Sequence, residues 1–87
     1  MKYLMFTLMT VFLVPHAFAE TECTKEPVSK WKNQESFKKE LEATYKIKVF
    51  KVTKGNCFEI YGWNKANKKV EIYFNPVDGK IVKERIE

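Results

Sequence analysis

Residues 57–74 read CFEIYGWNKANKKVEIYF, and the fold prediction depends on this stretch. Two segments in which apolar and polar side chains alternate flank a polar loop at Asn64–Asn67. A period of two is typical of β-strands with one buried face, and a loop of this length joins antiparallel neighbours. The expected buried face carries Phe58, Ile60, Val70, Ile72 and Phe74. The opposite face carries Cys57, Glu59, Tyr61, Trp63, Glu71 and Tyr73.

A further strand is predicted before this hairpin. Ile47 and Val49 alternate with lysines, which indicates a strand with one solvated face. Phe50 and Val52 then fall on the other parity. The change of parity predicts a β-bulge near Val49–Phe50.

The segments around these strands have the composition of turns and of an edge strand. Gly55-Asn56 marks a turn before the hairpin, and Pro76–Gly79 has the residues that a type I turn prefers. The short, charged segment 81–86 is typical of an edge strand. The sequence therefore predicts a four-stranded antiparallel meander.

A short helix is predicted ahead of the sheet. Asn33 is a good N-cap, and Glu35 puts a negative charge in the first turn. Phe37 and Leu41 share one helical face at i, i+4. We predict a helix over 34–43 and an α+β fold, in which one N-terminal helix packs on the meander sheet. The sheet residues expected beneath the helix are Ile47, Val49, Phe58, Ile60, Val70, Ile72 and Phe74.

The first 19 residues have the features of a secretory signal peptide. Lys2 is followed by an apolar run at 4–14 and by the small-x-small site Ala17-Phe18-Ala19. The run has about 11 residues, whereas spanning a bilayer takes roughly 20, so we expect cleavage and no stable membrane insertion. The expected organisation is a signal peptide at 1–19, an extended lead-in at 20–32 and a domain at 33–87. The expected location is the periplasm or the cell exterior.

The cysteines and the histidine limit the chemistry. Cys23 and Cys57 are the only cysteines, and an even count in a small exported domain favours a disulfide. Their wide spacing differs from a Cys-x-x-Cys redox motif, and a zinc site lacks further ligands. The single histidine, His16, lies in the predicted signal peptide. We therefore expect a structural disulfide, no cofactor, no metal and no enzymatic activity.

Two longer motifs resemble a known family. Gly55–Gly62 reads GNCFEIYG and Val70–Gly79 reads VEIYFNPVDG, and Cys23-Thr24 and Pro27-x-x-x-Trp31 precede them. Together they resemble PepSY-domain proteins, especially a small exported single-domain group, from Cys23 to the end of the chain. Asn67 and Thr44 stand where glycine is expected. PepSY domains occur in propeptides of secreted metallopeptidases, so the resemblance implies inhibition or chaperoning of a peptidase, and it supplies no functional residues.

The aromatic residues on the second sheet face are candidates for partner binding. Exposed Tyr and Trp side chains often dominate protein interfaces. In the alternative interpretation, the Cys23–Cys57 bond draws the lead-in over this face and Trp31 packs on Tyr61 or Trp63. These residues would then form a second small core, and both interpretations stay open here. The candidate contact residues are Trp63, Tyr61, Tyr73, Trp31, Lys65, Lys68 and Lys69.

The net charge of +5 leaves several classes of partner to weigh. Export and the interrupting Glu59 and Glu71 argue against nucleic acid. We expect a monomer that binds a protein partner, either a peptidase or another envelope protein. The alternative function is a redox-linked accessory of the cell envelope that serves electron-transfer partners.

Overall fold

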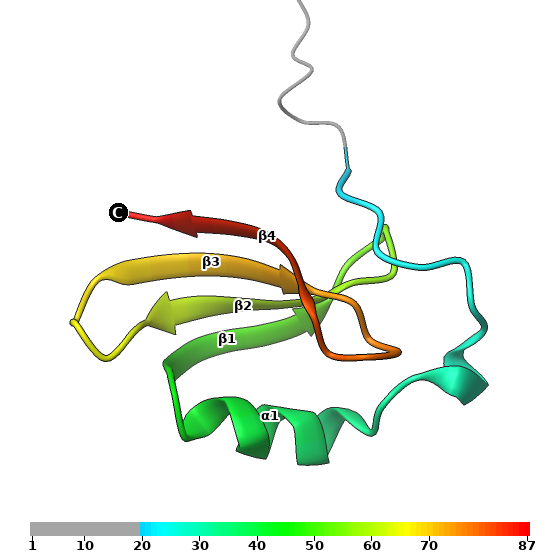
Figure 1. The fold of residues 1–87 in the computed structure, drawn as a ribbon, viewed down its shortest axis with the longest axis horizontal. Helices are drawn as coiled ribbons and strands as arrows, with labels where there is room; N and C mark the ends of the chain where they lie inside the picture. The colour runs from blue at the N-terminus through cyan, green and yellow to red at the C-terminus, as the bar shows by residue number, and fades with distance from the viewer. Residues whose placement is uncertain (1–19) are drawn as a thin grey trace, which may run out of the picture.

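The computed structural model describes residues 20–87, so the predicted signal peptide lies outside the described residues. One helix precedes a four-stranded antiparallel sheet in the order β1-β2-β3-β4, as predicted. Figure 1 shows α1 running beside β1, while β4 forms the opposite edge. The elements are α1 (Gln34–Glu42), β1 (Lys46–Val52), β2 (Phe58–Trp63), β3 (Lys69–Phe74) and β4 (Ile81–Ile86). The lead-in contains a short 3-10 turn, η2 (Val28–Lys30), which the sequence pattern did not indicate.

The helix is capped as its sequence predicts. The Asn33 side chain accepts a hydrogen bond of 2.9 Å from the backbone N–H of Ser36. This bond satisfies one of the free donors of the first turn. The helix ends at Glu42, one residue earlier than predicted, and Ala43 is its C-cap. Phe37 and Leu41 are the buried residues of α1, and they point at the sheet.

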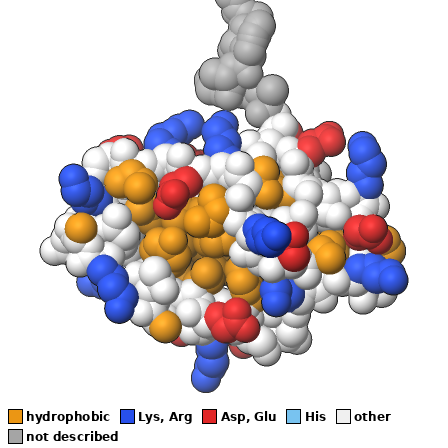
Figure 2. All heavy atoms as spheres, in the orientation of Figure 1, with side chains coloured by type: hydrophobic (Ala, Val, Ile, Leu, Met, Phe, Trp, Pro, Cys, Tyr) orange, Lys and Arg blue, Asp and Glu red, His pale blue; other side chains and the backbone are white. Residues whose placement is uncertain are grey.

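The core lies between α1 and one face of the sheet. Phe58, Ile60 and Ile72 are completely buried, and the Phe37 ring packs 5.7 Å from that of Phe58 and 5.3 Å from that of Phe74. The buried core residues are Phe37, Leu41, Phe58, Ile60, Val70, Ile72 and Phe74. Figure 2 shows apolar side chains gathered over the sheet between α1 and β4, because the helix lies towards the β1 edge.

The prediction that Val49 lies in the core is wrong. Val49 is 40 % exposed, and Phe50 packs against the core with its ring 5.4 Å from that of Phe58. The register shifts between Ile47 and Val49, so the extra residue is Lys48. The predicted bulge exists, but it begins earlier than expected. The shift turns Val49 to the other face and brings Phe50 to the core.

The two positions that depart from the family pattern are accommodated differently. Asn67 has φ 66°, in the left-handed region that asparagine tolerates, so it can replace glycine in the β2–β3 loop. Its loop is held by the Asn64 side chain, which accepts hydrogen bonds from the N–H groups of Ala66 and Lys68. Thr44 has no positive φ, so its turn does not require glycine.

The disulfide fastens the lead-in to the turn before β2. Cys23 is bonded to Cys57, with a Cα–Cα distance of 5.1 Å, and Cys57 is completely buried. The N–H of Cys23 donates to the carbonyl of Gly55, and the Asn75 side chain donates to the carbonyl of Cys23, both at 3.0 Å. A Cβ on Gly55 would lie 1.9 Å from the Thr21 carbonyl oxygen. Glycine is therefore needed where the two segments cross.

The structure places Trp31 on the core side of the sheet. Its ring meets that of Phe58 edge to face at 5.7 Å, and its indole N–H donates to the Glu26 carbonyl at 3.0 Å. The alternative in which Trp31 packs on Tyr61 or Trp63 is therefore wrong. The lead-in turns at η2 and passes the end of the sheet, and this path brings Trp31 to the core.

The disulfide should contribute a large share of the stability. We expect Cys57→Ser to lower the free energy of unfolding by about 2–4 kcal/mol, because the unfolded chain regains the entropy of the open loop. Urea denaturation of the oxidised wild type, the reduced wild type and the variant measures this. Equal midpoints for oxidised and reduced protein would contradict the expectation.

The corrected position of the bulge can be tested with two aliphatic residues. Ile72→Ala should lower the free energy of unfolding by about 2–5 kcal/mol, because it leaves a cavity in the core. Val49→Ala should cost less than about 1 kcal/mol, because the side chain is exposed. Thermal melts of both variants give the comparison, and similar losses would place Val49 in the core after all.

Candidate functional site

The face of the sheet opposite α1, called the open face here, is built by strand register. β2 and β3 pair so that Tyr61 lies opposite Glu71 and Glu59 lies opposite Tyr73. The outer strands add Lys51 beside Glu59 and Arg85 beside Glu71. Directly paired side chains share a face. The open face therefore has carboxyl and phenol groups at its centre and basic groups on both flanks.

Two glutamates occupy the centre of this face. Glu59 is only 2 % exposed, and Lys51 Nζ lies 3.8 Å from its Oε1. Glu71 accepts hydrogen bonds of 3.1 Å from the Tyr73 hydroxyl and from Arg85. Oε2 of Glu59 is buried and accepts no hydrogen bond from any residue in the range 20–87. A proton on Glu59 would let this oxygen donate to Glu71, which removes the unsatisfied acceptor.

The surroundings move the pKa values of the two glutamates apart. Burial, followed by the hydrogen bond with Glu71, raises the pKa of Glu59, and the charge of Lys51 opposes this only in part. Burial also acts to raise the pKa of Glu71. Hydrogen bonds from Glu59, Tyr61 and Tyr73 and the charge of Arg85 outweigh burial, so the pKa of Glu71 lies below its usual value. Of the two carboxyl groups, Glu59 therefore keeps its proton to higher pH than Glu71 does.

The neighbouring phenols stay protonated. Burial and the adjacent glutamates raise the pKa of Tyr61 to about 12, and the same causes raise the pKa of Tyr73. Lysine ammonium groups lie over the aromatic rings of this face. Lys46 Nζ is 5.7 Å from the Trp63 ring, Lys51 is 5.8 Å from Tyr61 and Lys83 is 6.0 Å from Tyr73. The rings thus hold basic side chains close to the sheet.

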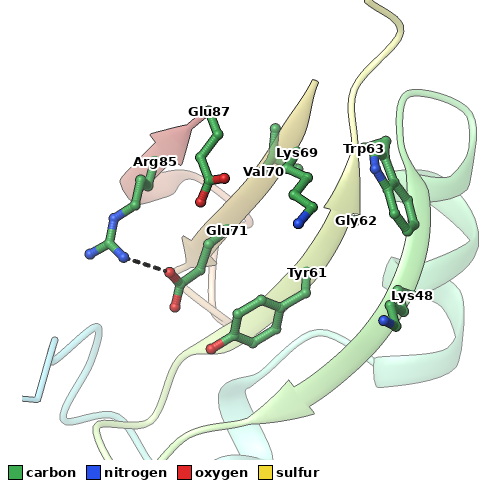
Figure 3. Close-up of a pocket in the computed structure, with 9 residues that line it drawn as sticks. All are labelled: Lys48, Tyr61, Gly62, Trp63, Lys69, Val70, Glu71, Arg85 and Glu87. Carbon is green, nitrogen blue, oxygen red and sulfur yellow. Dashed lines mark hydrogen bonds and ion pairs between the residues drawn. The ribbon is translucent and has the colours of Figure 1, made fainter. Parts of the chain in front are cut away.

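A hollow of about 230 Å³ opens near the β2–β3 loop. Figure 3 shows Lys69 and Glu87 above Tyr61, the Glu71 carboxylate turned towards Arg85, and Trp63 to one side. Its lining residues are Lys48, Tyr61, Gly62, Trp63, Lys69, Val70, Glu71, Arg85 and Glu87. Among residues 20–87, neither Lys48 nor Lys69 forms an ion pair. The hollow therefore combines an aromatic wall with free ammonium groups.

A second hollow, of about 300 Å³, lies at the other end of the open face. Glu59, Tyr61 and Tyr73 line it, together with the start of the lead-in at Glu20 and with residues 51–54. Tyr61 belongs to both hollows and is 38 % exposed. Of the lead-in residues 20–32, only Glu20 lines either hollow. The lead-in therefore leaves the middle of this face open.

The family model described as "Peptidase propeptide and YPEB domain" (PepSY) matches residues 3–85, nearly the whole chain. The chain belongs to the PepSY family. The resemblance seen in the sequence is thereby confirmed. No curated protein and no solved structure gave a significant match.

The PepSY fold brings together some of the predicted contact residues. Tyr61, Trp63 and Tyr73 share the open face, and Lys69 lines the first hollow. Lys65 and Lys68 are exposed in the loop beside Trp63. Trp31 lies apart from them, in contact with the core.

The structure adds residues that the sequence prediction missed. Arg85 and Lys48 line the first hollow, and Arg85 closes an ion pair of 3.1 Å with Glu71. The sequence does not show which residue Arg85 contacts, because its partner depends on the register between β4 and β3. The basic residues of the open face, its two hollows and its loop are Lys46, Lys48, Lys51, Lys54, Lys65, Lys68, Lys69, Lys83 and Arg85. The acidic residues in the same area are Glu20, Glu59, Glu71 and Glu87.

Residues 20–87 lack two features that would indicate other kinds of site. That part of the PepSY chain contains no group of three or more His, Cys, Asp or Glu side chains placed to hold a metal ion. It also has no helix with the length and hydropathy needed to cross a membrane.

The raised pKa of Glu59 should make the stability of the PepSY domain depend on pH. The native state holds this proton more tightly than the unfolded state, so the stabilisation is complete below the ordinary glutamate pKa. It is lost as the pH rises through the raised pKa. The lowered pKa of Glu71 acts at lower pH and in the opposite sense. We expect Glu59→Gln to flatten the decline in melting temperature as the pH rises above the ordinary glutamate pKa.

Melting curves across this range, with Glu40→Gln as the control, measure the effect. Glu40 is an exposed carboxylate on α1, and its replacement should leave the slope unchanged. A wild-type protein that gains stability across the same range would contradict the assignment of the proton to Glu59.

Proposed function

We propose that this PepSY domain is an exported, non-catalytic module that binds a protein partner through its open face, and that the partner is a secreted peptidase. The observation that carries the proposal is the exposed combination of Tyr61, Trp63 and free lysines around a hollow. The family description, a peptidase propeptide, supports the class of partner. The module would restrain the peptidase by occupying its surface.

Two features of the aromatic residues favour binding over a purely structural role. Tyr61 is 38 % exposed and Trp63 is half-buried, whereas the residues of the core side of β2 are completely buried. The partly exposed rings stand beside ammonium groups without becoming part of the core. Large rings of this kind lose little entropy on binding and are frequent anchors at interfaces.

Export and a structural disulfide belong to the same proposal. The leader-like features of residues 1–19 support export, and an oxidising compartment suits the Cys23–Cys57 bond. The alternative, a redox-linked accessory protein, has less support because Cys57 is completely buried and Cys23 is half-buried. A sulfur that solvent cannot reach is a poor target for thiol exchange.

We also propose that the domain is monomeric. β4 has a free edge on which Ile81, Val82 and Ile86 are 46–50 % exposed, so pairing with a second copy has to be considered. Suppose that β4 pairs antiparallel with β4 of a second copy and that corresponding faces of the two sheets stay on the same side. If the pairing is centred on Lys83, Glu84 or Arg85, that residue lies opposite its own copy, so like charges face each other. Such pairs destabilise a sheet, as is usual at protected edges.

The proposal predicts a specific loss in Trp63→Ala. We expect binding to weaken by about 2 kcal/mol or more, the usual scale for an aromatic anchor, with the melting temperature nearly unchanged. Affinity for, and inhibition of, a secreted metallopeptidase encoded by the same genome are the measurements. Val28→Ala, a change at an exposed lead-in residue, is the matched control and should bind normally.

Either of two results would contradict the proposal. Unfolding of Trp63→Ala as severe as that of Ile72→Ala would make Trp63 a core residue. Normal inhibition by a folded Trp63→Ala variant would exclude the open face as the binding surface.

A further inference from the structure

Charge is distributed unevenly over this domain. Basic side chains outnumber acidic ones on the open face and in its loop, whereas the two signs nearly balance over the rest of residues 20–87. The acidic groups of the face are also partly neutralised, since Glu71 is paired with Arg85 and Glu59 retains its proton more firmly. The excess positive charge of the domain is therefore concentrated on the surface proposed to bind.

From this distribution we propose that the partner presents carboxylate side chains, and that the hollow beside Trp63 is the seat of one of them, between Lys48 and Lys69. This inference rests on the proposed function and names the chemistry of the partner. Both lysines line the hollow, and neither forms an ion pair within the described residues. The rings of Tyr61 and Trp63 supply an apolar wall for the methylene groups of an incoming Glu or Asp.

The ammonium groups of Lys48 and Lys69 remain available to a ligand for two reasons. Few acidic side chains line the hollow, and one of them, Glu71, already has hydrogen-bond partners. Glu71 lines the hollow, but its carboxylate accepts hydrogen bonds from Tyr73 and from Arg85, towards which it turns in Figure 3. Glu87 is the remaining carboxylate of the lining, against Lys48, Lys69 and the shared Arg85. The hollow therefore carries a net positive charge, and a carboxylate entering it would gain charge-assisted hydrogen bonds.

The shape of the face favours a protein over an anionic membrane. A lipid surface is contacted best by protruding apolar side chains or by a flat basic patch. The open face instead has two hollows separated by Tyr61, and its aromatic rings lie beneath or beside ammonium groups. Separate hollows fit side chains that project from a folded partner or a peptide.

The probe for the test is a capped tetraglutamate peptide, titrated into the intact domain and followed by NMR. We expect shifts of the Lys48 and Lys69 amides and of the Trp63 indole N–H, with a Kd in about the millimolar range. Raising the salt concentration from about 50 to about 200 mM should weaken binding at least about threefold. A capped tetralysine peptide should cause no shifts at these positions.

Paired charge reversals separate a specific site from general attraction. Lys48→Glu/Lys69→Glu should weaken tetraglutamate binding at least about tenfold, because both ammonium groups become carboxylates. Lys38→Glu/Lys39→Glu changes the net charge equally but lies on α1, and it should weaken binding by less than about twofold. Equal losses in the two variants would overturn the assignment of the hollow.

The remaining outcomes distinguish this inference from the proposed function. Binding to phosphatidylglycerol vesicles without any response to tetraglutamate would overturn the inference in favour of a lipid surface. Peptidase inhibition that depends on Trp63 but is unchanged by Lys48→Glu/Lys69→Glu would overturn the inference and leave the proposed function standing. Tetraglutamate shifts at the hollow, without peptidase inhibition, would support the carboxylate seat and contradict the peptidase as partner.

Discussion

The pairing of β2 with β3 determines both surfaces of this sheet. It sets Ile60 opposite Ile72 towards α1 and Tyr61 opposite Glu71 on the other side. Because side chains alternate, a slip of one residue would turn the glutamates into the core and expose the isoleucines. The burial of apolar area on one side therefore fixes the arrangement of the ionisable groups on the other. The carboxyl pair, the hollow and the aromatic residues of the open face all depend on this register.

Sequence patterns were informative wherever one local signal decided the outcome. Asn33 as a cap, the period of two in β2 and β3 and the left-handed Asn67 follow from the conformational preferences of single residues or short segments. The disulfide followed from the number of cysteines. Departures came where the outcome depended on contacts between distant segments. The change of parity in β1 indicated a bulge, but the pairing with β2 decides that Lys48 is the extra residue.

The site was harder to predict than the fold for the same reason. The alternation placed Tyr61, Trp63 and Tyr73 on one face, but the burial of Glu59 depends on neighbours from three strands. The destination of Trp31 depends on how η2 turns the lead-in, and that turn has no periodic signal. A charge cluster on a sheet is built by register between strands, so no single stretch of sequence contains it.

The disulfide has a consequence for the response of the domain to a cut in its backbone. Residues 23–57 form a covalent ring that contains the lead-in, α1 and β1. A single cut of the backbone anywhere inside this ring leaves the two fragments joined through sulfur. A nick within this ring therefore separates the chain into two pieces without releasing either one from the domain.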